Sequence, residues 1–102
     1  IDALLDCEEI DAVFIGPYDL SASMGLTGQF DHPDYLDKVD RILKSCRRHG
    51  KAAGIHVVSP DPEQVEKRVR EGYRFIAYSL DITLLTSECQ RGLREMKKLR
   101  KA

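Results

Sequence analysis

The sequence predicts an α/β protein with parallel strands, built from three strand–helix units. Three short apolar runs, at residues 11–15, 52–58 and 75–78, have the length of buried strands. After each run, apolar residues recur every three or four positions, which is typical of an amphipathic helix. This alternation of strand and helix favours a parallel sheet with right-handed crossovers.

The first strand ends abruptly in a turn that carries a carboxylate. Residues 1–7 indicate the end of a helix, and the strand of residues 11–15 follows. Gly16 lets the backbone bend, and Pro17 removes a backbone donor, so the strand must stop there. Asp19 therefore lies just beyond the carboxyl end of a strand, where α/β folds place ligands.

A long helix is predicted to follow a loop at residues 21–28 that has room for one short helical turn. Pro33 suits the first turn of the long helix, and Gly50 suits the position just after its end. Five apolar side chains at helical spacing are expected to face inward: Leu36, Val39, Ile42, Leu43 and Cys46.

The second helix is predicted to start in the segment 59–62, which supplies a capping residue and two prolines. Val65 and Val69 are expected to face inward, and Gly72 closes the helix.

Asp81 is expected to cap the last helix, which follows the third strand. Its apolar stripe continues almost to the end of the chain through Leu84, Leu85, Cys89, Leu93, Met96 and Leu99.

Composition indicates a soluble globular protein and argues against several classes of partner. Hydrophobic residues make up 42% and charged residues 32% of the 102 residues, and the net charge is −1. This charge gives no reason to expect nucleic acid or an anionic membrane. The chain has three cysteines that lie far apart in the sequence, Cys7, Cys46 and Cys89, so we expect reduced thiols. No segment resembles an export signal or a membrane span, so we expect a cytoplasmic protein.

Three units are too few to close an eight-unit barrel, and they would leave one face of each strand without a partner. Either further chain or another copy must cover that face.

Two residues are candidates for chemistry, and each has a structural alternative. Asp19 either caps the next turn or binds a hard divalent cation, which prefers oxygen ligands. His56, at the end of the second strand, is either a hydrogen-bonded structural residue or part of a site. His32 and His49 are interpreted as loop or cap residues, and Tyr73 and Tyr78 as packing residues.

The segments Gly16-Pro17-Tyr18-Asp19-Leu20-Ser21, His32-Pro33, residues 50–55 and residues 81–85 together resemble the HpcH/HpaI aldolase family of metal-dependent pyruvate aldolases. The resemblance covers residues 1–102 and implies the last three βα units of a TIM (β/α)8 barrel. It also implies carbon–carbon lyase chemistry, the cleavage of 4-hydroxy-2-oxo acids to pyruvate and an aldehyde.

The resemblance also assigns roles to residues. It implies that Asp19 binds a divalent metal ion (Mg, Mn or Co), that the backbone N–H groups of Gly16 and Tyr18 bind the pyruvate carboxylate, and that His56 lines the aldehyde side. The family commonly has a small residue in place of Tyr18. Its remaining catalytic and metal-binding residues would precede Ile1, so we expect little or no activity from these 102 residues alone. A homo-oligomer, a hexamer in the family, is also implied.

Two other functions stay open at this point. One is a non-catalytic partial barrel that associates with itself or a partner. The other is a small flavodoxin-like ligand-binding domain, in which the first strand would have a neighbour on each side.

Overall fold

A computed structural model describes residues 1–100 and contains one parallel sheet of three strands. The strands are β1 (Ala12–Ile15), β2 (Ala52–Val57) and β3 (Phe75–Tyr78), and they pair in the order β1-β2-β3. All three predicted strands are therefore confirmed. Because β2 lies in the centre of the described sheet, the order differs from that of the flavodoxin-like alternative, which places the first strand there.

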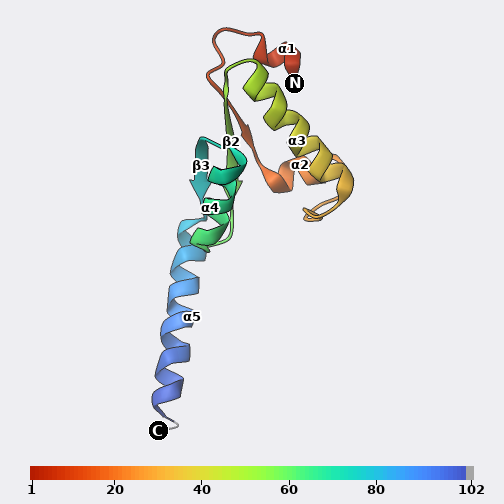
Figure 1. Cartoon of the computed structure of the whole chain (residues 1–102). Helices are drawn as coiled ribbons and strands as arrows, with labels where there is room; N and C mark the ends of the chain where they lie inside the picture. Colours follow the sequence, from red (N-terminus) through yellow and green to blue (C-terminus); the bar gives the residue numbers. More distant parts are fainter. Residues whose placement is uncertain (101–102) are drawn as a thin grey trace.

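Five helices accompany the sheet within residues 1–100 (Figure 1). They are α1 (Asp2–Leu5), α2 (Pro17–Ser23), α3 (Pro33–Arg48), α4 (Pro62–Glu71) and α5 (Asp81–Leu99). Both α3 and α4 contact β2. The core lies between them and the sheet face that carries Ala53, Ile55 and Val57 of β2.

The inward faces of α3 and α4 differ in part from those predicted. Leu36 is 51% exposed, whereas its neighbour Tyr35 is only 5% exposed. Tyr35 falls in line with Val39 and Cys46 at spacings of four and seven residues, and Leu36 lies beside this line. In α4, Val65 packs against the core as expected, but Val69 is 56% exposed. No residue of this helix is fully buried.

Two helix starts also differ from the predictions. The turn after β1 opens directly into α2, with Gly16 as the N-cap and Pro17 as the first helical residue, so Asp19 lies in a helical first turn rather than ahead of a loop. Asp81 does not cap α5: Leu80 holds the N-cap position, and the Asp81 carboxylate accepts from the adjacent Ile82 N–H at 2.7 Å.

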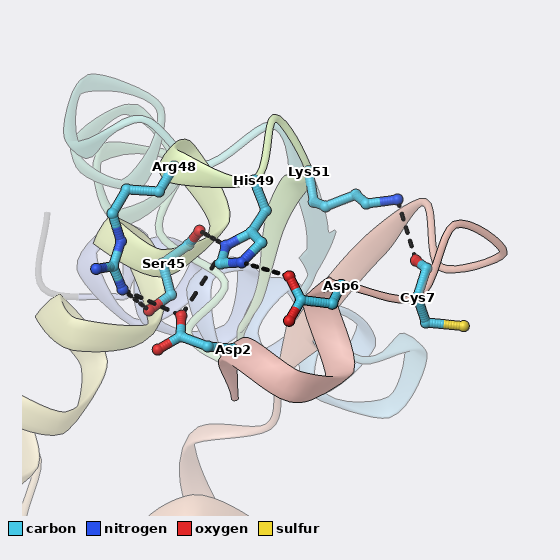
Figure 2. A network of polar contacts seen from close by, with 7 residues as sticks. All are labelled: Asp2, Asp6, Cys7, Ser45, Arg48, His49 and Lys51. Carbon is cyan, nitrogen blue, oxygen red and sulfur yellow. Dashed lines mark hydrogen bonds and ion pairs between the residues drawn. The ribbon is translucent and has the colours of Figure 1, made fainter.

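A polar network ties α1 to the carboxyl end of α3 (Figure 2). Arg48 Nη2 donates to Asp2 Oδ1 at 3.0 Å, and His49 Nε2 lies 3.2 Å from Asp6 Oδ1. The Ser45 hydroxyl, and then the charges of Arg48 and His49, hold the pKa of Asp2 below its usual value. His49 is the C-cap of α3, so its predicted role as a cap residue is confirmed.

The sheet face opposite the core carries an aromatic pair across a glycine. Gly54 is in register with Phe14 on one side and Phe75 on the other, and the two rings lie 5.2 Å apart between centroids. Phe14 is 43% exposed and Phe75 is 53% exposed. The described residues thus leave an apolar layer of the sheet uncovered, as the sequence predicted.

The last helix, α5, extends away from the sheet (Figure 1). None of its residues is buried, and the large apolar side chains along it are exposed: Ile82, Leu84, Leu85, Leu93, Met96 and Leu99. Among residues 1–100, no helix is both long enough and apolar enough to cross a membrane.

Replacing Gly54 by alanine is expected to destabilise the protein by about 1–3 kcal/mol because the site is already full. A Cβ there would lie 2.9 Å from both Phe14 Cδ2 and the Phe75 backbone oxygen. Urea unfolding measures the change. Gly92→Ala is the matched control: its Cβ meets no atom within 4 Å, so it should stabilise α5 by about 0.5–1 kcal/mol. Equal effects of the two substitutions would contradict this packing.

Tyr73→Phe is expected to leave stability unchanged or raise it by about 1 kcal/mol. The Tyr73 ring is buried, and its hydroxyl has no hydrogen-bond partner among residues 1–100. The same burial raises the pKa of Tyr73 to about 12. Thermal and urea unfolding of the variant test this, and a loss of more than 1 kcal/mol would show that the hydroxyl is satisfied.

Candidate functional site

The three strands end at the same edge of the sheet because they are parallel. The turn at Gly16 follows β1, His56 lies next to the last residue of β2, and Ser79 follows β3. Open sheets and barrels of this kind bind ligands at the carboxyl edge. The candidate residues from the sequence therefore share one edge.

The Asp19 carboxylate has no hydrogen-bond or ion-pair partner among residues 1–100. It is exposed, and it does not cap α2. The predicted alternative of a capping role is therefore wrong. The carboxylate leans back over the turn, since a Cβ on Gly16 would lie 2.6 Å from Asp19 Oδ2. Glycine at position 16 leaves the space in which these oxygens sit.

The backbone of the same turn offers donors beside this carboxylate. The first N–H groups of a helix lack partners within the helix. In residues 1–100 neither the Gly16 nor the Tyr18 N–H donates a hydrogen bond to another backbone group. Two donors and one carboxylate thus lie within four consecutive residues, a combination that can hold an anionic group next to a cation.

A divalent cation would find only part of its ligand set here. Mg²⁺ and Mn²⁺ favour about six oxygen ligands. Asp19 can supply one or two of them, but the part of the chain that the structure describes holds no group of three or more His, Cys, Asp or Glu side chains placed to bind a metal. Asp19 fits as one ligand of a site that other residues must complete.

Tyr18 and His56 line a cavity of about 150 Å³ at this edge, whereas Gly16 and Asp19 lie outside its lining. The cavity is bounded by α2, α3, α4 and the end of β2. Its lining residues are Pro17, Tyr18, Phe30, Tyr35, His56, Val57, Val58, Ser59, Gln64 and Arg68. The lining is therefore aromatic and apolar on the side of α2 and α3, and mixed on the side of α4 and β2, where polar residues lie beside Val57 and Val58.

Sequence reasoning missed the aromatic wall of this cavity. The Tyr18 ring meets Phe30 edge-on at 5.0 Å, and Phe30 packs against Tyr35 at 5.5 Å. Phe30 lies in a loop, where no periodicity reveals a packing role. A shift of the α3 stripe by one residue would have identified Tyr35.

Ser21 and Ser79 were also not predicted to matter. Ser21 is fully buried in α2: its hydroxyl donates to the Tyr18 carbonyl and accepts from the Gly28 N–H, which fixes the loop that carries Phe30. The Ser79 carbonyl oxygen lies 2.8 Å from His56 Nε2. Both serines act through contacts with backbone or side-chain groups that follow no periodic spacing, 3 and 7 residues away for Ser21 and 23 residues away for Ser79, and sequence alone shows no such pairing.

Comparison with known proteins identifies relatives along almost the whole chain. The chain is 41% identical over 93 residues to a 2-keto-3-deoxy-L-rhamnonate aldolase of Klebsiella pneumoniae. The match covers 91% of this chain and 34% of that protein. The chain is also 41% identical over 85 residues to a hydroxypyruvate/pyruvate aldolase of Roseobacter denitrificans, covering 83% of this chain and 32% of the relative. The chain thus spans about one third of the length of these relatives.

A solved structure has the same fold. An HpcH/HpaI aldolase/citrate lyase family protein from Burkholderia cenocepacia superposes with a TM-score of 0.87 at 30% identity, covering 94% of this chain and 37% of that one. The family model for HpcH/HpaI aldolase/citrate lyase matches residues 1–87. The chain therefore belongs to the HpcH/HpaI aldolase/citrate lyase family.

Proposed function

We propose that this chain forms the carboxyl-terminal part of a metal-dependent aldolase that cleaves 4-hydroxy-2-oxo acids to pyruvate and an aldehyde. The observation that carries the proposal is the exposed Asp19 carboxylate, which makes no hydrogen bond within residues 1–100 and lies beside the N–H groups of Gly16 and Tyr18 at the carboxyl edge of the sheet. Aldolase names among the relatives support it.

In this proposal the turn holds the oxo acid, and the cavity holds the aldehyde part. The Gly16 and Tyr18 N–H groups donate to the carboxylate of the oxo acid, and Asp19 contributes an oxygen to the cation, which is Mg²⁺, Mn²⁺ or Co²⁺. When bound, such a cation stabilises the negative charge that develops as the carbon–carbon bond breaks. The Tyr18 ring packs edge-on against Phe30, and both residues line the cavity, so a residue this large at position 18 leaves less room for the aldehyde part than a small residue would.

The site is completed outside these residues. We propose that the three units are the last βα units of an eight-unit barrel, in which further strands cover Phe14 and Phe75 and supply the remaining metal ligands and catalytic groups. The 102 residues by themselves are accordingly expected to release little or no pyruvate.

Asp19→Asn in the natural gene product is expected to lower kcat/KM for pyruvate release from a 4-hydroxy-2-oxo acid at least 100-fold, because an amide binds a divalent cation more weakly than a carboxylate does. The fold should be unaffected, since the carboxylate makes no hydrogen bond within the described chain. Pyruvate release is measured with added Mg²⁺ or Mn²⁺ and after chelation.

Asp81→Asn is the matched control, because Asp81 is an exposed carboxylate at the same edge that, within residues 1–100, accepts a hydrogen bond only from the N–H of its neighbour Ile82. It should keep most of the activity. Full activity in Asp19→Asn, or activity that survives chelation, would overturn the proposed role of Asp19.

We also propose that the apolar stripe of α5 packs against another subunit in a homo-oligomer. Ile82 extends the predicted stripe at its start, whereas Leu84, at 39% the least exposed large apolar side chain of α5, lies off its line; the proposed contact residues are Ile82, Leu85, Cys89, Leu93, Met96 and Leu99. No residue of α5 is buried within its own chain, although the helix is long and strongly amphipathic. The same observation favours the second candidate function, a partial barrel that serves only in assembly.

Leu85→Glu is expected to weaken the oligomer at least tenfold, because it places a charge in the proposed interface. Sedimentation velocity of the natural gene product over a range of concentrations measures this. Arg94→Glu, on the opposite face of α5, is the control and should leave the mass unchanged. A monomeric parent protein, or equal effects of both variants, would contradict the interface.

A further inference from the structure

The helix that carries Asp19 is too short to be stable by itself. α2 has seven residues, and a helix of this length is marginal in water without tertiary contacts. Leu20 packs against the core, and Ser21 is the only buried residue of the helix. The place of Asp19, in the first turn of α2, therefore depends on what holds these two neighbours.

Ser21 joins α2 to the loop that follows it. Its side chain is fully buried, and its hydroxyl donates to the Tyr18 carbonyl at 3.1 Å and accepts from the Gly28 N–H at 3.1 Å. Its backbone oxygen accepts from the N–H groups of Met24 and Leu26, at 3.2 and 2.8 Å. Three N–H groups between residues 24 and 28 thus donate to this one residue. Burial of a hydroxyl is unfavourable unless it is hydrogen-bonded, and here it both donates and accepts.

The same loop is attached to α2 a second time, through the residue on the other side of Asp19 in the chain. A Cβ on Gly28 would lie 3.8 Å from Tyr18 Cε1, so the Tyr18 ring packs over this glycine. The ring also meets Phe30 edge-on at 5.0 Å. Asp19 therefore lies between two residues, Tyr18 and Ser21, that both contact the loop.

Ser23 shows which of these contacts sets Ser21 apart. A hydroxyl bond to a carbonyl three or four residues earlier is common for serine in helices and assigns no role by itself. Ser23 makes such a bond, to the Leu20 carbonyl at 2.7 Å, but it is exposed and makes no other side-chain hydrogen bond within residues 1–100. The difference between the two serines is burial and the bond to Gly28.

We infer that Ser21 is a positioning residue of the site. By holding the loop of residues 24–28 against α2, it keeps the Asp19 carboxylate and the N–H groups of Gly16 and Tyr18 in the arrangement that binds a divalent cation together with an oxo acid. The inference rests on the proposed aldolase function and adds a residue to its site. Ser21 is buried and acts through the turn, and a turn that had to be ordered on binding would bind more weakly.

The first test measures binding of the metal ion. In the natural gene product, Ser21→Ala leaves the Gly28 N–H without its acceptor and should weaken Mn²⁺ binding in the presence of pyruvate about tenfold or more. The electron paramagnetic resonance signal of free Mn²⁺ gives the affinity, and thermal unfolding shows that the variant is folded. Ser23→Ala is the matched control and should bind Mn²⁺ as the parent protein does.

The kinetics of the same variant separate positioning from a role in catalysis. Because Ser21 contacts no substrate, Ser21→Ala should need more Mn²⁺ for half-maximal pyruvate release but recover most of its kcat at saturating Mn²⁺. A kcat that stays low at saturating Mn²⁺ would contradict a positioning role.

The second test needs no variant. Because coupling between two sites is reciprocal, Mg²⁺ and pyruvate added to the parent protein should slow hydrogen exchange of the Gly28 N–H about fivefold or more. The Glu63 N–H is the control, since it also donates to a side-chain oxygen, Asp61 Oδ1 at 3.0 Å, but lies at the start of α4. Its exchange rate should not change.

Two results would overturn the inference and leave the aldolase proposal intact. One is an equal effect of Ser21→Ala and Ser23→Ala on Mn²⁺ affinity, including no effect of either. The other is unchanged exchange at Gly28 when Mg²⁺ and pyruvate bind, and this result decides the matter if Ser21→Ala does not fold. A parent protein that neither binds Mn²⁺ nor releases pyruvate would instead refute the proposed function itself, and this inference with it.

Discussion

The parallel pairing of three strands, with Gly54 between Phe14 and Phe75, is the constraint on which the rest of the structure depends. Two aromatic rings on the outer strands β1 and β3 can meet across β2 only because the central strand has no side chain there; a Cβ on Gly54 would lie 2.9 Å from Phe14 Cδ2 and from the Phe75 backbone oxygen. This register puts Ala53, Ile55 and Val57 on the opposite face, where α3 and α4 cover them. The layer of Phe14 and Phe75 stays open within the described chain, which is why we expect it to be completed by further strands.

The same register assembles the candidate site at one edge. Since all strands run in one direction, the Gly16 turn, His56 and Ser79 lie at the same edge of the sheet, where the strands end. The turn contributes N–H donors and a carboxylate, while the ends of β2 and β3 contribute a histidine held by a strained serine backbone. These parts have different partners in the proposed reaction: the turn serves the oxo acid and cation, and His56 serves the aldehyde. Their separation fits the finding that Asp19 lies outside the cavity that Tyr18 and His56 line.

Much of the fold could be predicted from the sequence because the strands are short apolar runs and the helix ends carry proline and glycine. The predictions were wrong where one position decides which side chain faces the core or where a helix begins. Tyr35 rather than Leu36 faces inward. The sequence favours Leu36 for the inward position because leucine is fully buried more often than tyrosine. Pro17 was taken to end a strand and also begins α2. In the candidate site, the place of Asp19 at the carboxyl edge follows from its position after β1. The contacts of Phe30, Ser21 and Ser79 join segments 5 to 23 residues apart without any periodic pattern, so the sequence does not reveal them.

The central claim is that the Gly16-to-Asp19 turn binds a divalent cation together with an oxo acid. Paramagnetic broadening by Mn²⁺ tests it most directly, because the effect falls off steeply with distance from the ion. With pyruvate and a small amount of Mn²⁺ added to the natural gene product, the account predicts that the backbone amide signals of Gly16, Tyr18 and Asp19 broaden first, well before that of Asp81 at the same edge. Sharp signals in the turn, or equal broadening at Asp81, would contradict the account.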